Sequence, residues 1–110
     1  MAVGRPVTVT IPHQLGRAEA RRRLEGAAGQ IRSQLSGIAT VEDEQWVGDT
    51  LTFRITAMAQ SVSGRIDVME EQVAVEVRLP WMLAMLAEKL KGKISRQGSV
   101  LLEDKRPDRA

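Results

Sequence analysis

Residues that support covalent catalysis are scarce in this chain. It contains no Cys and no Tyr, and His13 is its single histidine. Acyl transfer needs a nucleophile together with a base and an orienting group, and no serine lies in a nucleophile-elbow sequence. A Ser–His pair using His13 stays open as an alternative. The position of His13 between Pro12 and a helix start at Gly16 favours a structural role, in which its ring hydrogen-bonds the backbone of that turn.

The acidic run Glu42-Asp43-Glu44 is the best candidate for a cation site. Hard cations require several convergent oxygen ligands, whereas neighbouring side chains of a strand alternate between the two faces. We therefore predict a solvated, aggregation-resistant edge strand here and no metal site. Zinc-ligand spacing, a phosphate-binding glycine loop and a dinucleotide fingerprint are also missing from the sequence, so no cofactor is expected. Together these observations predict a protein that is not an enzyme.

The basic run Arg21-Arg22-Arg23 could contact an anionic partner. Pairs four residues apart, Glu19 with Arg23 and Arg21 with Glu25, would neutralise part of its charge, so we interpret it as a solvated helix face. The whole chain has a net charge of only +2. The outer face of the predicted sheet also offers no aromatic platform on which bases could stack. Both features argue against a nucleic-acid partner.

The stretch RLPWMLAMLAEKLKGKIS, residues 78–95, carries a second kind of candidate. At about 100° per residue, one side of a helix here collects Leu83, Leu86, Leu90 and Ile94, which we predict to be buried. The residues off that side form a candidate contact surface: Trp81, Met82, Met85 and Lys89. One interpretation is that the sheet and the first helix cover these residues. The other is that they contact a dimer mate, another protein or an apolar surface, for which methionine is well suited.

Alternating and helical patterns define the elements that position these residues. Period-two alternation predicts strands at 7–11, 40–47, 51–57, 62–68 and 73–79, with hairpin turns at Gly48-Asp49 and Glu70-Glu71. A helix is expected from the cap at Gly16 to Gly37, and a second from Pro80 to Gly98.

The element order β-α-β-β-β-β-α predicts an α+β protein with an antiparallel five-stranded sheet and both helices on one face. This order is similar to TATA-binding-protein-like and small helix-grip-like folds. The chain has 110 residues, which fits a single domain at 1–102 followed by a disordered polar tail at 103–110. No run is long enough to span a bilayer, and the N-terminal stretch does not read as a signal peptide.

Two motifs resemble a known family. IPHQLGRAEARRRLEG, residues 11–26, is similar to the N-terminal motif of the putative polyhydroxyalkanoic acid system proteins, and KGKI at 91–94 is similar to their second motif. WVGDTLTFRI and SVSGRIDV between them also fit, so the resemblance covers residues 7–97. Gly16 stands where members often carry Ser or Thr, and the tail after Gly98 departs from the family pattern. The resemblance implies a place in bacterial polyester storage and supplies no catalytic residue.

The first functional hypothesis is a non-enzymatic, cytoplasmic accessory protein of polyhydroxyalkanoate storage that binds a protein or the granule surface. Association of two copies of the chain into a homodimer is a further alternative. The alternative is a helix-grip-like module that binds an acyl or hydroxyacyl ligand. That alternative requires an apolar cavity, lined by Phe53, Ile66, Val75 and Leu86, in a chain with little core to spare.

Overall fold

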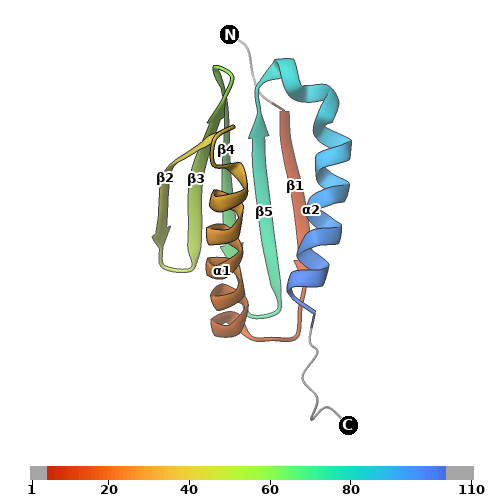
Figure 1. Cartoon of the computed structure of the whole chain (residues 1–110). Helices are drawn as coiled ribbons and strands as arrows, with labels where there is room; N and C mark the ends of the chain where they lie inside the picture. The colour runs from red at the N-terminus through yellow and green to blue at the C-terminus, as the bar shows by residue number, and fades with distance from the viewer. Residues whose placement is uncertain (1–4, 104–110) are drawn as a thin grey trace.

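The computed structural model describes residues 5–103, which form one antiparallel five-stranded sheet with two α-helices on one face (Figure 1). This confirms the predicted α+β class and element order. The predicted polar tail lies outside the described residues from position 104 onward. The elements are β1 (Arg5–Pro12), α1 (Arg17–Leu35), β2 (Thr40–Val47), β3 (Thr50–Ala57), β4 (Gln60–Val68), β5 (Gln72–Leu79), the 3₁₀ helix η1 (Trp81–Leu86) and α2 (Ala87–Leu101).

The strands are arranged in the order β1-β5-β4-β3-β2. Strands β2 to β5 form the predicted meander, and the chain's first strand pairs with its last, with Val9 opposite Val75. Period-two alternation places the valines of β1 and β5, together with Ile11, on the helix-bearing face, where they are buried. The opposite face carries polar residues such as Thr8, Glu76 and Arg65.

One cross-strand pair shapes the middle of the helix-bearing face. Phe53 of β3 lies opposite Gly64 of β4, and a Cβ atom at position 64 would come within 2.3 Å of the Phe53 ring. Glycine is therefore required there for the ring to lie flat across β4. A ring that covers a glycine on the neighbouring strand stabilises the pair and gives the sheet an apolar floor between the two helices.

The first helix begins and ends as predicted. Gly16 is its N-cap with φ of 81°, and Gly37 follows the C-cap Ser36 with φ of 91°. Both conformations are easy for glycine and strained for residues with a Cβ. Glu19 lies in the first turn, where a carboxylate interacts favourably with the exposed amides.

The segment after Pro80 differs from the prediction. Residues 81–86 form a 3₁₀ helix, and the α-helix begins only at Ala87. A 3₁₀ helix turns about 120° per residue, against 100° for an α-helix, so the side that faces the sheet shifts along the chain. Ala87 is buried in place of Leu86, which is 45% exposed. The prediction of deep burial is wrong for Leu86, and Leu83, Leu90 and Ile94 are only partly buried.

The end of α2 was also predicted wrongly. The helix continues through Gly98 to Leu101. A Cβ at position 98 would lie 2.2 Å from Cδ1 of Ile11 in β1. Gly98 therefore permits close packing of α2 on β1 within the helix, and it does not terminate it. This contact holds α2 over β1, which forms one edge of the sheet. Strand β2 forms the other edge (Figure 1).

Candidate contact surface

His13 is part of the architecture of the turn that follows β1. Its ring is buried; Nδ1 accepts a hydrogen bond from the Leu15 amide at 3.1 Å, and Nε2 lies 3.1 Å from the Met69 carbonyl oxygen. Because Nδ1 is an acceptor here, Nε2 carries the hydrogen and donates it to Met69. The two bonds tie the β1–α1 turn to the β4–β5 turn. This geometry matches the structural role predicted for His13.

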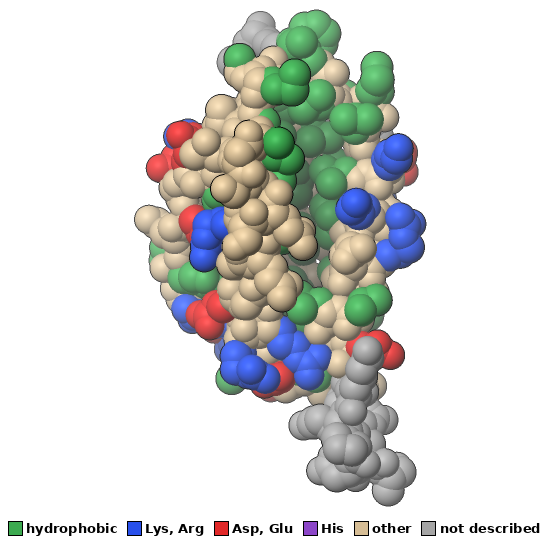
Figure 2. All heavy atoms as spheres, viewed as in Figure 1, with side chains coloured by type: hydrophobic (Ala, Val, Ile, Leu, Met, Phe, Trp, Pro, Cys, Tyr) green, Lys and Arg blue, Asp and Glu red, His purple; other side chains and the backbone are tan. Residues whose placement is uncertain are grey.

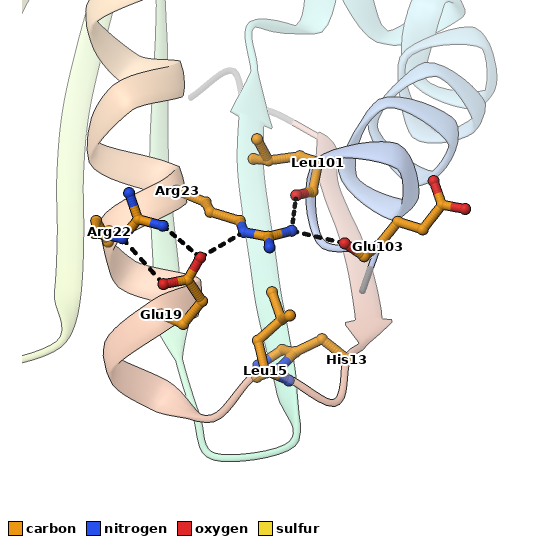
Figure 3. Close-up of polar contacts among 7 residues, drawn as sticks. All are labelled: His13, Leu15, Glu19, Arg22, Arg23, Leu101 and Glu103. Atoms are coloured by element: carbon orange, nitrogen blue, oxygen red, sulfur yellow. Dashed lines mark hydrogen bonds and ion pairs between the residues drawn. The ribbon is translucent and has the colours of Figure 1, made fainter. Parts of the chain in front are cut away.

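The arginine run is more than a solvated face. Nη1 of Arg23 donates to the carbonyl oxygens of Leu101, at 3.0 Å, and of Glu103, at 2.7 Å, so Arg23 reaches from α1 to the end of α2 (Figure 3). These carbonyls lie at the C-terminus of α2, where the helix dipole favours a cation. The solvated-face interpretation is therefore wrong for Arg23, and we call its contacts with the two carbonyls the Arg23 bridge.

Arg21 is also structural. Its guanidinium stacks 4.4 Å from the Trp46 ring centroid and donates to the Gly48 carbonyl oxygen at 2.8 Å. It thereby fastens α1 to the β2–β3 turn through a cation–π contact and a hydrogen bond. Of the three arginines, only Arg22 has a mostly exposed side chain, at 71%. The sequence run therefore reflects three different local roles.

Glu19 orients the Arg23 side chain through a hydrogen bond from its guanidinium. Its carboxylate accepts hydrogen bonds from Arg22 at 2.6 Å and from Arg23 at 2.9 Å (Figure 3). These bonds from Arg22 and Arg23 lower the pKa of Glu19 to about 2. The carboxylate thus stays ionised well into the acid range and keeps the Arg23 guanidinium oriented toward α2.

An apolar groove of about 370 Å³ runs between α1 and α2 (Figure 2). Sheet residues Phe53, Ile66, Val75 and Val77 lie at its floor, and the polar residues in its lining are the amides Gln30, Gln34 and Gln97. The groove is open to solvent, so it does not contradict the expectation that the core has little room for an enclosed cavity. Three of the four residues predicted to line such a space do so. Leu86 does not, because the 3₁₀ turn carries it away.

The three apolar members of the predicted contact surface are exposed. Trp81 is 63%, Met82 53% and Met85 86% accessible to solvent, and Lys89, one turn farther on, is exposed as well. The monomer therefore does not cover them. Leu86 extends the same patch, a member that the uniform helical periodicity concealed. Figure 2 shows hydrophobic side chains along the groove and over the end of the molecule that carries η1.

The acidic residues of β2 pair with arginines. Arg54 lies 2.6 Å from Asp43 and 3.3 Å from Glu42, while Glu44 pairs with Arg32 of α1 on the helix-bearing face. Asp43 occupies a bulge in β2 with φ of 54°. Within residues 5–103, no group of three or more potential ligands is arranged to hold a metal ion.

The geometry thus offers an exposed apolar patch and an open apolar groove, both assembled on the helix-bearing side. Among the described residues, no helix has the length and apolar character needed to cross a membrane. A search of curated proteins found no significant match. A family model matches residues 7–102, nearly the whole described domain. The chain belongs to the family of putative polyhydroxyalkanoic acid system proteins.

Proposed function

We propose that this protein is a non-enzymatic accessory protein of bacterial polyhydroxyalkanoate storage, acting in the cytoplasm by binding. Its contact surface is formed by Trp81, Met82 and Met85 of η1 with Lys89 at the rim. The partner is the granule surface or a protein that resides on it. Family membership supports the biological setting, and the exposed patch supports the mode of action.

The observation that carries this proposal is the exposure of Trp81 and Met85 beside a well-packed sheet. A tryptophan side chain buries about 150–250 Å² when it is covered, so leaving it in water forfeits a large favourable contribution. Contiguous exposed apolar residues on a soluble domain mark interaction sites more often than chance. Methionines suit an irregular partner because their side chains are unbranched and adaptable.

A second function is favoured by the groove between the helices. Its volume of about 370 Å³ lies at the lower end of the range of small-molecule sites. The apolar floor with three amide side chains suits an uncharged acyl or hydroxyacyl chain, whose carbonyl oxygens could accept hydrogen bonds from glutamine. Titration of the purified protein with a fatty acyl methyl ester tests this alternative. Binding in the groove should shift the NMR signals of Phe53 and Ile66.

Partition onto granules tests the leading proposal. Granules isolated with their proteins are mixed with the purified chain and pelleted, and the bound fraction is measured. The double variant Trp81→Ala, Met85→Ala should lose most of the binding, while its melting temperature stays close to that of the parent. The matched control is Val47→Ala, Val100→Ala, which removes two comparably exposed apolar side chains elsewhere. Equal binding by both double variants would refute the contact surface.

A further inference from the structure

Three segments far apart in the sequence lie at the end of the molecule that carries η1. Because neighbouring strands are antiparallel, the α1–β2 connection, the β3–β4 turn and the β5–η1 connection all lie at this end (Figure 1). We call the segments 36–40, 57–60 and 80–87 together the apolar end. Two of them lie outside the contact surface that the sequence predicted.

The three segments of the apolar end expose large hydrophobic side chains and contain no charged residue, and the charged residues that flank them in the chain or the sheet are Arg5, Arg78, Glu88 and Lys89. Met58 is 93% and Ile38 70% exposed, in addition to the residues of η1. Charged residues make up 27% of the chain, yet none occurs in any of the three segments. The connecting segments at the opposite end do contain charged residues: Asp49, Glu70, Glu71 and Glu103.

The β3–β4 turn, which exposes Met58, has a strained backbone conformation. Met58 and Ala59 form the two-residue loop between the paired residues Ala57 and Gln60, with φ of 52° and 66°. Positive φ at both positions defines a type I′ turn, which strongly prefers Asn-Gly. Residues with a Cβ are strained there. A strained turn that displays a bare methionine suggests that the side chain has a use outside the monomer.

We propose that the apolar end docks end-on onto an uncharged ester surface, the exposed polymer of the storage granule, with Met58, Ile38, Trp81 and Met85 entering it together. This inference rests on the proposed function and names the partner of its contact surface. The opposite, charged end then faces water. Trp81 suits the boundary because its ring is apolar and its indole N–H can donate to an ester carbonyl.

Charge distinguishes this surface from a phospholipid membrane. Peripheral attachment to anionic lipids relies on clustered Lys and Arg near the bilayer. The three segments of the apolar end contain neither, and the cations that flank η1 in the sequence are not clustered: Arg78 pairs with Glu76, and Lys89 is a single residue at the rim. A polyester carries carbonyl acceptors and alkyl groups without net charge, so a charge-free apolar end matches it. Binding should therefore change little with added salt, in contrast to attachment driven by ion pairs.

The test uses protein-free polyhydroxybutyrate particles, the full chain and sedimentation across a protein titration. The informative variant is Met58→Asn, because asparagine favours positive φ. It should raise the melting temperature of the protein and at the same time weaken particle binding about tenfold, as removal of one inserted apolar side chain implies. Ile38→Gln should weaken binding several-fold, and Val47→Gln, on the other end, should leave it unchanged.

Each result decides between the possibilities. Weaker binding by Met58→Asn with higher stability supports docking by the whole apolar end. Unchanged binding by both Met58→Asn and Ile38→Gln overturns the inference, even if Trp81→Ala with Met85→Ala abolishes binding. Binding to native granules without binding to protein-free particles also overturns it, since the partner would then be a granule protein and the proposed function would stand. Salt-sensitive binding to phosphatidylglycerol vesicles, stronger than to the polyester, contradicts the choice of surface.

Discussion

The two ends of this molecule are built by opposite means. At the charged end, side chains bind to backbone: His13 ties two turns together, and Arg23 joins α1 to the end of α2. At the apolar end, Trp81, Met85 and Met58 project into solvent. The difference indicates that the charged end contributes to the stability of the fold, whereas the exposed side chains of the apolar end contribute little to it.

The contacts at the charged end also explain why a groove remains between the two helices. The Arg23 bridge links them near the charged end, and Gly98 lets α2 lie close on β1. Toward the other end of α1, Ile31 remains 47% exposed although it borders the groove. A bundle or sheet whose helices packed along their whole length would have covered it.

The largest loss of stability should come from Gly98→Val. Its Cβ would overlap Cδ1 of the buried Ile11, and overpacking of this kind costs about 1–3 kcal/mol. Urea unfolding measures the change. The matched control is Gly26→Ala in α1, where a Cβ meets open space, and this change should stabilise the protein by up to about 1 kcal/mol. An unchanged free energy of unfolding for Gly98→Val would mean that α2 does not pack closely on β1.

His13→Ala should lower the free energy of unfolding by about 2 kcal/mol, because it leaves the Leu15 amide and the Met69 carbonyl without their partner. Granule binding should be preserved, since His13 lies at the charged end. Thermal unfolding and the granule assay of the proposed function give the two readouts. Loss of binding at unchanged stability would assign His13 to the contact surface and remove the distinction between the ends.

Arg23→Met should cost about 1–2 kcal/mol, because two carbonyls at the end of α2 lose a charged donor. Amide hydrogen exchange in the last turn of α2 should become faster. Arg22→Met is the control: its side chain is exposed and its ion pair with Glu19 is screened by solvent, so this substitution should change stability less. Equal effects of the two substitutions would show that the bridge does not hold the helices together.

Glu19 should make a smaller, pH-dependent contribution. Its folded-state pKa of about 2 lies below the ordinary value of 4.5, so the folded state favours the ionised form. The resulting stability is present above about pH 4.5 and is lost as the pH falls from there toward 2. The melting temperature of Glu19→Gln should therefore depend less on pH across this window than that of the parent. If the melting temperatures of the two proteins showed the same dependence on pH, the proposed stabilising role of the Glu19 carboxylate would be contradicted.

The fold was largely predictable because alternation is a strong signal. β-branched residues at every second position set the strands, and the glycines at 16, 37 and 48 marked turns that require positive φ. Gly98 was misread because a glycine near the end of a helix usually signals its terminus, and only tertiary contact with Ile11 reveals the other reason. Leu86 was misplaced because periodicity assumes one helix type from Pro80 onward.

The exposure of the candidate contact surface was predictable only in part. The sequence shows that Trp81 and Met85 lie off the core stripe, and the structure exposes both. No pattern in the sequence indicated Met58, because a Met-Ala pair is not a recognised hairpin turn and its position at the same end as η1 depends on strand order. The groove was not predictable either, since the separation of two helices follows from packing across the sheet and is not encoded in either helix alone.

The most direct test of the account compares the same change at the two ends. The free energy of unfolding and the binding to isolated granules are measured for Trp81→Ala with Met85→Ala and for His13→Ala. The first protein should keep its stability within about 0.5 kcal/mol, as expected for exposed sites, and lose binding. The second should lose stability and keep binding wherever it is folded. A Trp81, Met85 variant that unfolds readily, or that still binds like the parent, would contradict the central claim.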